Sequence, residues 1–193
     1  MRLGKDFIDK PIYTLDEGKF IGKIQDLYLD DSLEAVLGVY LGAQGLVRRR
    51  AQLIRSGDVV LFGVDAVLVK SAGVVTDDNE FAAAKSWLRR DKLTGRDVDT
   101  PGGTRLGVLG DVVIDAAGRV TAFALSRVFV EGPVAEKRVI DRRAVQDTGS
   151  VDGRMTVDLS RVEAALVDMP VLPPAEDIPI TVEPKELGLG ARD

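Results

Sequence analysis

A nine-residue block with a fixed order of glycine, aspartate and apolar residues occurs twice in this chain. The first copy is GKIQDLYLD at residues 22–30, and the second is GVLGDVVID at residues 107–115. Three of the nine positions are identical, and four more pair one apolar residue with another. Each copy is followed by a turn, an apolar run, a charged segment and a further short strand. Because such an order indicates one supersecondary unit used twice, the chain is predicted to contain two copies of one small fold.

The match continues upstream of each block. Gly4–Phe7 and Gly95–Val98 both read as glycine, base, aspartate and an apolar residue. The distance to the following block differs between the copies, and a loop of different length explains this because surface loops tolerate insertions.

The apolar positions within the block predict a strand with a bulge. Leu27 and Leu29 share one side of an extended strand, whereas Ile24 has the opposite parity. All three face one core only if the strand carries an extra residue near residues 25–26, and the second copy has the same pattern near residues 110–111. We therefore expect interrupted strand pairing at both places.

Short valine-rich runs separated by Gly and Asp turns predict a mainly all-β fold of two small barrels, each followed by a short α-helix. The segment 76–92 begins with acids, ends with bases and has apolar residues at helical spacing, which predicts a helical linker. Ser160–Glu163 has the capping-box pattern of a helix start. The expected parts are a first barrel at 1–75, the helical linker at 76–92, a second barrel with a terminal helix at 93–169, and a Pro-rich acidic tail at 170–193.

The chain contains no cysteine and no histidine. Disulfides, thiolate metal sites, cysteine nucleophiles and Ser-His-Asp triads are therefore excluded, so we expect no cofactor and no enzymatic activity. The net charge of -5 lacks the basic surplus that is typical of a general nucleic-acid binder. No apolar run approaches the ~20 residues of a spanning helix, and no signal peptide pattern is present. The expected location is the cytoplasm.

The duplication singles out four acids: Asp26, Asp30, Asp111 and Asp115. Metal binding or acid–base chemistry is one interpretation of these residues. The favoured interpretation is turn and bulge chemistry, in which an aspartate accepts hydrogen bonds from nearby backbone N–H groups. Their spacing does not match an EF-hand loop.

The complete pattern is Gly-base-Asp-apolar, then Gly-x-apolar-x-Asp-apolar-apolar-apolar-Asp, then a turn and an apolar strand. It resembles the PRC-barrel family, which includes the cytoplasmic domain of the photosynthetic reaction centre H subunit and the C-terminal domain of a ribosome maturation factor. Residues 4–69 resemble one such barrel and residues 95–159 resemble a second. The resemblance implies a small β-barrel used for protein–protein contact, and it implies no shared catalytic residues.

Two basic clusters supply the candidate binding residues. The first consists of Arg48, Arg49, Arg50 and Arg55, and the second, in the comparable region of the other copy, of Lys137, Arg138, Arg142 and Arg143. One interpretation is a basic surface on one rim of each barrel, which would attract an acidic protein, RNA or anionic lipid. The other is a pair of solvated hairpin ends.

These observations together predict a non-enzymatic protein–protein interaction or scaffolding module. Its partners would be other proteins, or a second copy of the chain in a homo-oligomer. The alternative is an RNA-processing or ribosome-maturation accessory factor that uses the basic clusters.

Overall fold

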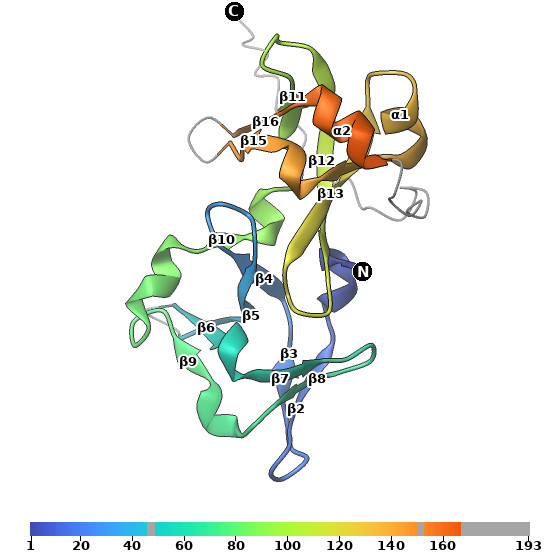
Figure 1. Cartoon of the computed structure of the whole chain (residues 1–193). Coiled ribbons are helices and arrows are strands. Elements are labelled where there is room, and N and C mark those ends of the chain that lie inside the picture. The colour runs from blue at the N-terminus through green and yellow to red at the C-terminus, as the bar shows by residue number, and fades with distance from the viewer. Residues whose placement is uncertain (46–48, 150–152, 167–193) are drawn as a thin grey trace, which may run out of the picture.

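Strands make up most of the regular structure of this protein. The computed structural model describes residues 1–45, 49–149 and 153–166 (Figure 1), and it confirms the mainly β fold class. The strands are β1 (Arg2–Leu3), β2 (Pro11–Thr14), β3 (Phe20–Lys23), β4 (Asp26–Leu29), β5 (Val36–Gln44), β6 (Arg50–Arg55), β7 (Val59–Phe62), β8 (Val67–Val69), β9 (Thr76–Asp77), β10 (Leu88–Arg89), β11 (Asp97–Asp99), β12 (Arg105–Ile114), β13 (Val120–Val128), β14 (Val139–Asp141), β15 (Val145–Asp147) and β16 (Arg154–Val157). The α-helices are α1 (Pro133–Lys137) and α2 (Leu159–Leu166), and the 3₁₀ helices are η1 (Gly4–Phe7), η2 (Ser56–Asp58), η3 (Ala72–Val74), η4 (Ala82–Ser86), η5 (Arg90–Lys92) and η6 (Arg142–Ala144).

The strands of the described residues form three sheets. The N-terminal half, residues 1–78, supplies a four-stranded sheet in the order β3-β2-β8-β7 and most of a five-stranded sheet in the order β10-β4-β5-β6-β9. The C-terminal half, residues 93–166, supplies a sheet in the order β14-β13-β12-β11-β16-β15, to which β1 adds by pairing with β12.

The two halves use the same strand pairings in the same order. In the N-terminal half β2 pairs antiparallel with β3 and parallel with β8, and β8 pairs antiparallel with β7. In the C-terminal half β11 pairs antiparallel with β12 and parallel with β16, and β16 pairs antiparallel with β15. The antiparallel series β4-β5-β6 corresponds to β12-β13-β14 in the same way. Positions in the two halves can therefore be compared through strand register.

The predicted interruption of the repeated block is confirmed in both halves. β3 ends at Lys23 and β4 begins at Asp26, so the strand is broken between them. In β12 the pairing with β13 shifts register between Leu109 and Asp111. The apolar positions of both blocks are all buried, as one inward-facing set requires: Ile24, Leu27, Leu29, Leu109, Val112 and Ile114.

The prediction of an α-helix at residues 76–92 is wrong. This segment consists of β9, η4, β10 and η5. The Asp77 carboxylate accepts hydrogen bonds from the backbone N–H groups of Asn79 (2.8 Å) and Glu80 (2.9 Å), and such local bonds compete with a helix. β9 pairs with β6 and β10 pairs with β4. Tertiary strand pairing and turn chemistry therefore override the helical periodicity.

The helix predicted at the end of the second unit is present as α2. The residue that precedes it is Asp158 rather than Ser160, and its Oδ1 accepts a hydrogen bond from the Arg161 N–H at 3.2 Å. In the N-terminal half the corresponding place is taken by the 3₁₀ helix η3. Residues 167–169 and the tail at 170–193 lie outside the described residues.

The two halves are joined by strand pairing and by a common core. Buried side chains from both halves, such as Phe7, Leu33 and Phe123, belong to one contiguous hydrophobic cluster. The short strand that leads into each half pairs with a strand of the other half. β1 pairs with β12 of the C-terminal half, and β10 pairs with β4 of the N-terminal half. The connection between the halves is therefore more extensive than the linker that the sequence predicted.

The hydrogen bonds also correct the upstream part of the repeat. The Asp9 N–H donates to the Ile24 carbonyl, and the Gly95 N–H donates to the Leu109 carbonyl, each at 2.8 Å. Both donors have a positive φ, 62° at Asp9 and 92° at Gly95. Gly95 is thus the structural counterpart of Asp9 and not of Gly4, so the predicted match between the two upstream patterns is wrong by five residues.

A buried charge network joins the halves at Asp26 and Asp111, which are 1% and 2% exposed. Arg90 donates to both carboxylates, from Nη1 to Asp111 Oδ1 at 2.9 Å and from Nε to Asp26 Oδ1 at 3.3 Å. The backbone N–H of Lys5 donates to Asp111 at 2.8 Å, and that of Asp91 donates to Asp26 at 3.2 Å. The segment that enters each half therefore satisfies the aspartate of the other half.

The turn aspartates have the structural role that the sequence favoured. Asp30 Oδ1 accepts hydrogen bonds from the N–H groups of Glu34 (2.8 Å) and Ala35 (2.7 Å), and Asp115 Oδ1 accepts one from Arg119 at 2.9 Å. Ala35 and Arg119 also form a β-bridge with each other. The two equivalent turns therefore meet at the junction of the halves.

Replacing Arg90 by Met tests the charge network. Asp111 would stay buried without its Arg90 partner, and Asp26 would keep only its pair with Arg89 at 3.0 Å. Breaking a buried ion pair in this way costs about 3–5 kcal/mol. We expect the free energy of unfolding, measured by urea titration, to fall by about that amount. The matched control is Arg119→Met, whose exposed pair with Asp115 is expected to contribute less than about 1 kcal/mol. Equal losses in the two variants would contradict the role assigned to Arg90.

Asp91 is expected to make stability depend on pH. Its partial burial, together with the neighbouring Asp26 carboxylate, raises the pKa of Asp91. A pKa that is higher in the folded than in the unfolded state favours the protonated form, so stability is lost as the pH rises through the folded-state pKa. Asp91→Asn should therefore gain stability relative to the parent chain between about pH 4 and pH 7.

Asp115 provides a control, because its effect on stability is expected to change with pH in the opposite direction. Burial alone would raise the pKa of Asp115, but the N–H groups of Arg119 and Ala117 and the Arg119 guanidinium hold it below its usual range. Asp115→Asn should therefore lose stability relative to the parent chain as the pH rises through the acidic range. Urea titrations at both ends of this range measure the two differences, and a loss in Asp91→Asn on raising the pH would refute the assignment.

Candidate functional site

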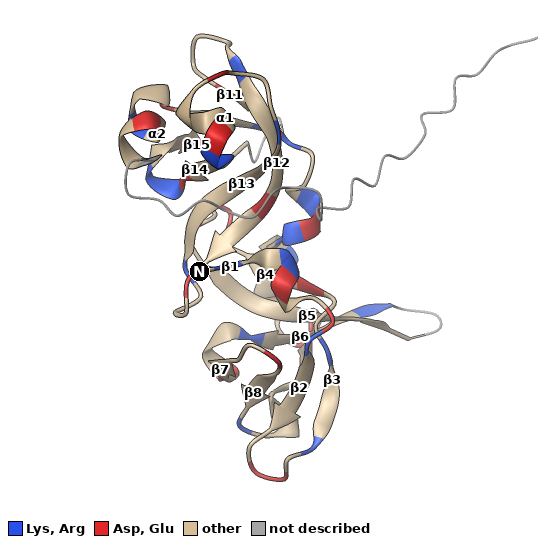
Figure 2. Cartoon of the chain, turned by 90° about the vertical axis from the view of Figure 1, so that its right-hand side faces the viewer, with Lys and Arg blue, Asp and Glu red and all other residues tan. Residues whose placement is uncertain are grey.

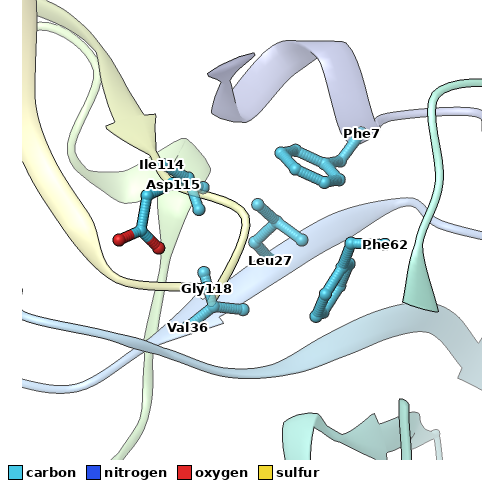
Figure 3. A pocket seen from close by; sticks show the side chains of 7 residues that line it. All are labelled: Phe7, Leu27, Val36, Phe62, Ile114, Asp115 and Gly118. Atoms are coloured by element: carbon cyan, nitrogen blue, oxygen red, sulfur yellow. The ribbon is translucent and has the colours of Figure 1, made fainter. Parts of the chain in front are cut away.

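The junction between the halves is packed core. Figure 3 shows Phe7, Leu27, Val36, Phe62 and Ile114 converging there. The rings of Phe7 and Phe62 meet edge to face with their centroids 5.7 Å apart. The crevice between these side chains is too narrow to admit a water molecule, so it offers no room for a ligand.

Two further properties concern residues 1–45, 49–149 and 153–166. Within these ranges no three acidic side chains gather closely enough to hold a metal ion. Within the same ranges no helix has the length and apolar character needed to cross a bilayer.

The first basic cluster lies along β6. Arg50 pairs with Asp77 at 3.3 Å, and Arg55 pairs with Asp58 at 2.8 Å. Arg48 lies outside the described residues. An open hollow of about 240 Å³ is lined by Arg49, Arg50, Asp78, Asn79 and Lys85.

The second basic cluster surrounds β14, and its arginines are bonded to acceptors of the protein itself. Arg142 donates to the Leu33 carbonyl of the other half at 3.0 Å. Arg143 pairs with the aspartate of β14 at 2.9 Å, and Arg138 donates to a carbonyl of β13 at 3.1 Å. Lys137 is half-buried at the end of α1. A common basic binding surface built from both clusters stays a prediction that no observation here tests.

Exposed apolar side chains gather on the four-stranded sheet, a surface that the sequence analysis missed. Figures 1 and 2 place this sheet at the end of the molecule farthest from the C-terminal half. Contiguous apolar patches larger than a few hundred Å² are uncommon on monomeric soluble proteins and are typical of interaction surfaces. Of the seven large apolar residues that are exposed in the described part of the chain, five belong to this sheet and its turns: Leu15, Phe20, Val60, Leu61 and Val64.

Strand register aligns four apolar side chains across the outer face of this sheet. Tyr13 of β2 lies opposite both Phe20 of β3 and Leu68 of β8, and Leu68 lies opposite Leu61 of β7. The rings of Tyr13 and Phe20 are in contact, with centroids 5.8 Å apart. The alternate residues of β2 and β8 are buried in the core, so these four point outward. We call Phe20, Tyr13, Leu68 and Leu61 the apolar row.

The equivalent row of the C-terminal half is polar throughout. Asp99 of β11 lies opposite both Arg105 of β12 and Thr156 of β16, and Thr156 lies opposite Asp147 of β15. Arg154, beside this row, pairs with Asp99 at 3.0 Å. The same strand pairings thus support a charged surface in one half and an apolar surface in the other. The fold itself does not require the apolar row.

The sequence does contain a signal for this surface. Residues 11–15 read PIYTL and residues 67–69 read VLV, with apolar residues at both parities, whereas residues 97–99 alternate as DVD. Strands that are apolar on both sides are typically covered on both faces. β2 and β8 bury only one face among the described residues, and their other face carries the half-buried Tyr13 and Leu68.

A comparison with known proteins supports part of the resemblance seen in the sequence. Residues 1–78 match the family model of the PRC-barrel domain. The matched residues contain the four-stranded sheet with the apolar row and four strands of the five-stranded sheet. No curated protein matches the chain.

The exposed members of the apolar row should be replaceable without unfolding the protein. Phe20 is 51% exposed and Leu61 is 53% exposed, and substitutions at such surface positions usually change stability by less than about 1 kcal/mol. We therefore expect Phe20→Lys and Leu61→Lys to retain the parent circular dichroism spectrum and unfolding midpoint in urea. A loss of about 3 kcal/mol or more in either variant would show that the side chain is part of the core.

Proposed function

We propose that this chain is a non-enzymatic protein–protein interaction module built from two PRC-type units in tandem, and that a partner protein docks on the apolar row. The single observation that carries the proposal is the contrast between the two outer faces of equivalent sheets. One face bears four aligned apolar side chains, and the other bears aspartates, an arginine and a threonine. A partner that covers the apolar face gains the free energy of removing this surface from water.

The matching pairings of the two halves support the tandem arrangement. β2 with its neighbours and β11 with its neighbours form the same combination of two antiparallel pairs and one parallel pair. The equivalent hydrogen bonds made by Asp9 and Gly95 add a local match. The family match covers residues 1–78, so the second PRC-type unit rests on this internal correspondence.

The use of the repeated acids supports a role without catalysis. Asp26 and Asp111 are buried and accept hydrogen bonds from Arg90 and from backbone N–H groups. Asp30 and Asp115 hold turns. These carboxylates therefore have structural partners, and the chain offers no histidine or cysteine to act beside them. The cytoplasm remains the expected location.

The contacts of the basic clusters favour a protein partner over RNA. Arg50, Arg55 and Arg143 each pair with a carboxylate, which offsets the positive charge that phosphate contacts require. The net charge of -5 acts in the same direction.

Affinity purification of the full chain from its own cells tests the proposed function. The bait would be compared with a Phe20→Lys and Leu61→Lys double variant and with Phe129→Lys. Phe129 is a matched control because it is 49% exposed and lies in the other half. We expect proteins that are retained by the parent chain and by Phe129→Lys to be lost from the double variant. The proposal is overturned if the parent chain retains no protein, its own untagged copy included, or if the double variant retains the same set.

A further inference from the structure

Charged residues at the two ends of the four-stranded sheet alternate in sign. At one end Lys23 closes β3, and Asp65 lies in the turn between β7 and β8. At the other end Asp16 and Glu17 lie in the turn between β2 and β3, and Lys70 follows β8. All five residues are exposed. The β3 side therefore carries a cation at the first end and anions at the second, and the β8 side carries the opposite order.

Asp9 and Lys10 precede β2 at the first end as an opposite pair, so together they add no net charge there. Lys10 lies at the same end as Lys23, where its Nζ donates to the Val64 carbonyl. Lys19 is paired through its backbone with Thr14, whose side chain is buried on the core side. Lys19 is exposed in the same turn as Asp16 and Glu17, where the two acids outnumber it.

A two-fold axis along the apolar row makes this face complementary to itself. Rotation about that axis stacks a second sheet on the first, keeps each strand over its own copy and exchanges the two ends of every strand. The apolar row then packs against the apolar row of the second copy. Lys23 meets the Asp16 and Glu17 of the second copy, and Lys70 meets its Asp65. Each of these contacts joins opposite charges and occurs twice.

We infer that a second copy of this chain docks on the outer face of the β3-β2-β8-β7 sheet, in a face-to-face dimer whose two-fold axis follows the apolar row. The inference rests on the proposed function, and it names the partner of the same surface. Charge complementarity selects the second copy, since an unrelated apolar partner would leave these end charges without a reason for their alternation.

The size of the face sets the strength of this dimer. Four strands about 4.8 Å apart and about seven residues long, turns included, give a face of about 19 Å by 23 Å. This projection, on the order of 450 Å², lies below the ~800 Å² per partner of a standard stable interface. The dimer is therefore weak and forms reversibly, with a dissociation constant on the order of micromolar or above.

Sedimentation velocity of the full chain measures this association. Between about 1 μM and several hundred micromolar, the parent chain and Phe129→Lys should shift from the monomer towards the dimer. Phe20→Lys and Leu61→Lys, tested separately, should weaken the association at least about tenfold, because each places two lysines near the axis of an apolar contact. Circular dichroism of each variant checks that it is folded.

Charge reversal tests the two-fold geometry itself. Lys23→Glu alone and Glu17→Lys alone should each weaken the dimer, because each places like charges opposite one another. The double variant should recover part of the association, since the reversed charges at positions 23 and 17 again face each other as opposites, whereas the unchanged Asp16 faces a like charge. Without recovery, the proposed axis is wrong even if a dimer forms.

The outcomes separate this inference from the proposed function. A parent chain that stays monomeric at all concentrations, or a dimer that persists in Phe20→Lys and Leu61→Lys, overturns the second copy as occupant. If the chain is monomeric but loses a different protein partner in the double variant Phe20→Lys and Leu61→Lys, the interaction function stands and only the identity of the partner is wrong. If neither a dimer nor another partner depends on the apolar row, both proposals fail.

Discussion

Arg90 holds together the junction on which the arrangement of the two halves depends. It is bonded to Asp26 of one half and Asp111 of the other, and both carboxylates are almost completely buried. Counting back from the Asp9–Gly95 equivalence, the counterpart of Arg90 is Gly4, and a Cβ atom there would lie 2.5 Å from Arg90 Cδ. The segment that leads into the C-terminal half therefore supplies the guanidinium, and Gly4 of the N-terminal half supplies the space for it. This asymmetry lets the Arg90 guanidinium reach both buried anions, and Arg89 adds a second ion pair to Asp26 at 3.0 Å.

Outside this junction, each half has one sheet whose outer face is free to differ. Inward residues of these sheets, such as Ile12, Val67, Val98 and Met155, are buried and apolar in both halves, because the common core requires it. Outward residues have no such constraint, and they are polar in the C-terminal half and apolar in the N-terminal half. Because both sheets have the same strand pairings, a residue type found on only one of the two outer faces is not required by the fold. For that reason we propose a contact, and not a folding requirement, as the role of the apolar row.

The features that the sequence predicted correctly are those set by local chemistry and parity. The bulge followed from the positions of Ile24, Leu27 and Leu29, and the turns followed from Asp30 and Asp115. The prediction of a helix at 76–92 was wrong. The segment has apolar residues at helical spacing, but the pairing of β9 and β10 with the five-stranded sheet stabilises an extended backbone instead. The apolar row was not predicted, because alignment of four side chains from four strands appears only when register is known. The basic clusters were predicted as candidate binding residues because their charges are close together in sequence. The sequence could not show that an acceptor such as the Leu33 carbonyl, far away along the chain, bonds Arg142.

Hydrogen exchange measured at low and at high protein concentration tests most directly whether the outer face of the β3-β2-β8-β7 sheet meets a second copy. The account predicts slower exchange at high concentration for the amides of β3, β2, β8 and β7, because contact with a second copy suppresses the local opening of this sheet through which its amides exchange. It predicts unchanged exchange in β11 and β16, which lie under the polar row. Exchange that is independent of concentration in β3 and β7, or protection that appears at β11 and β16 instead, would contradict the account.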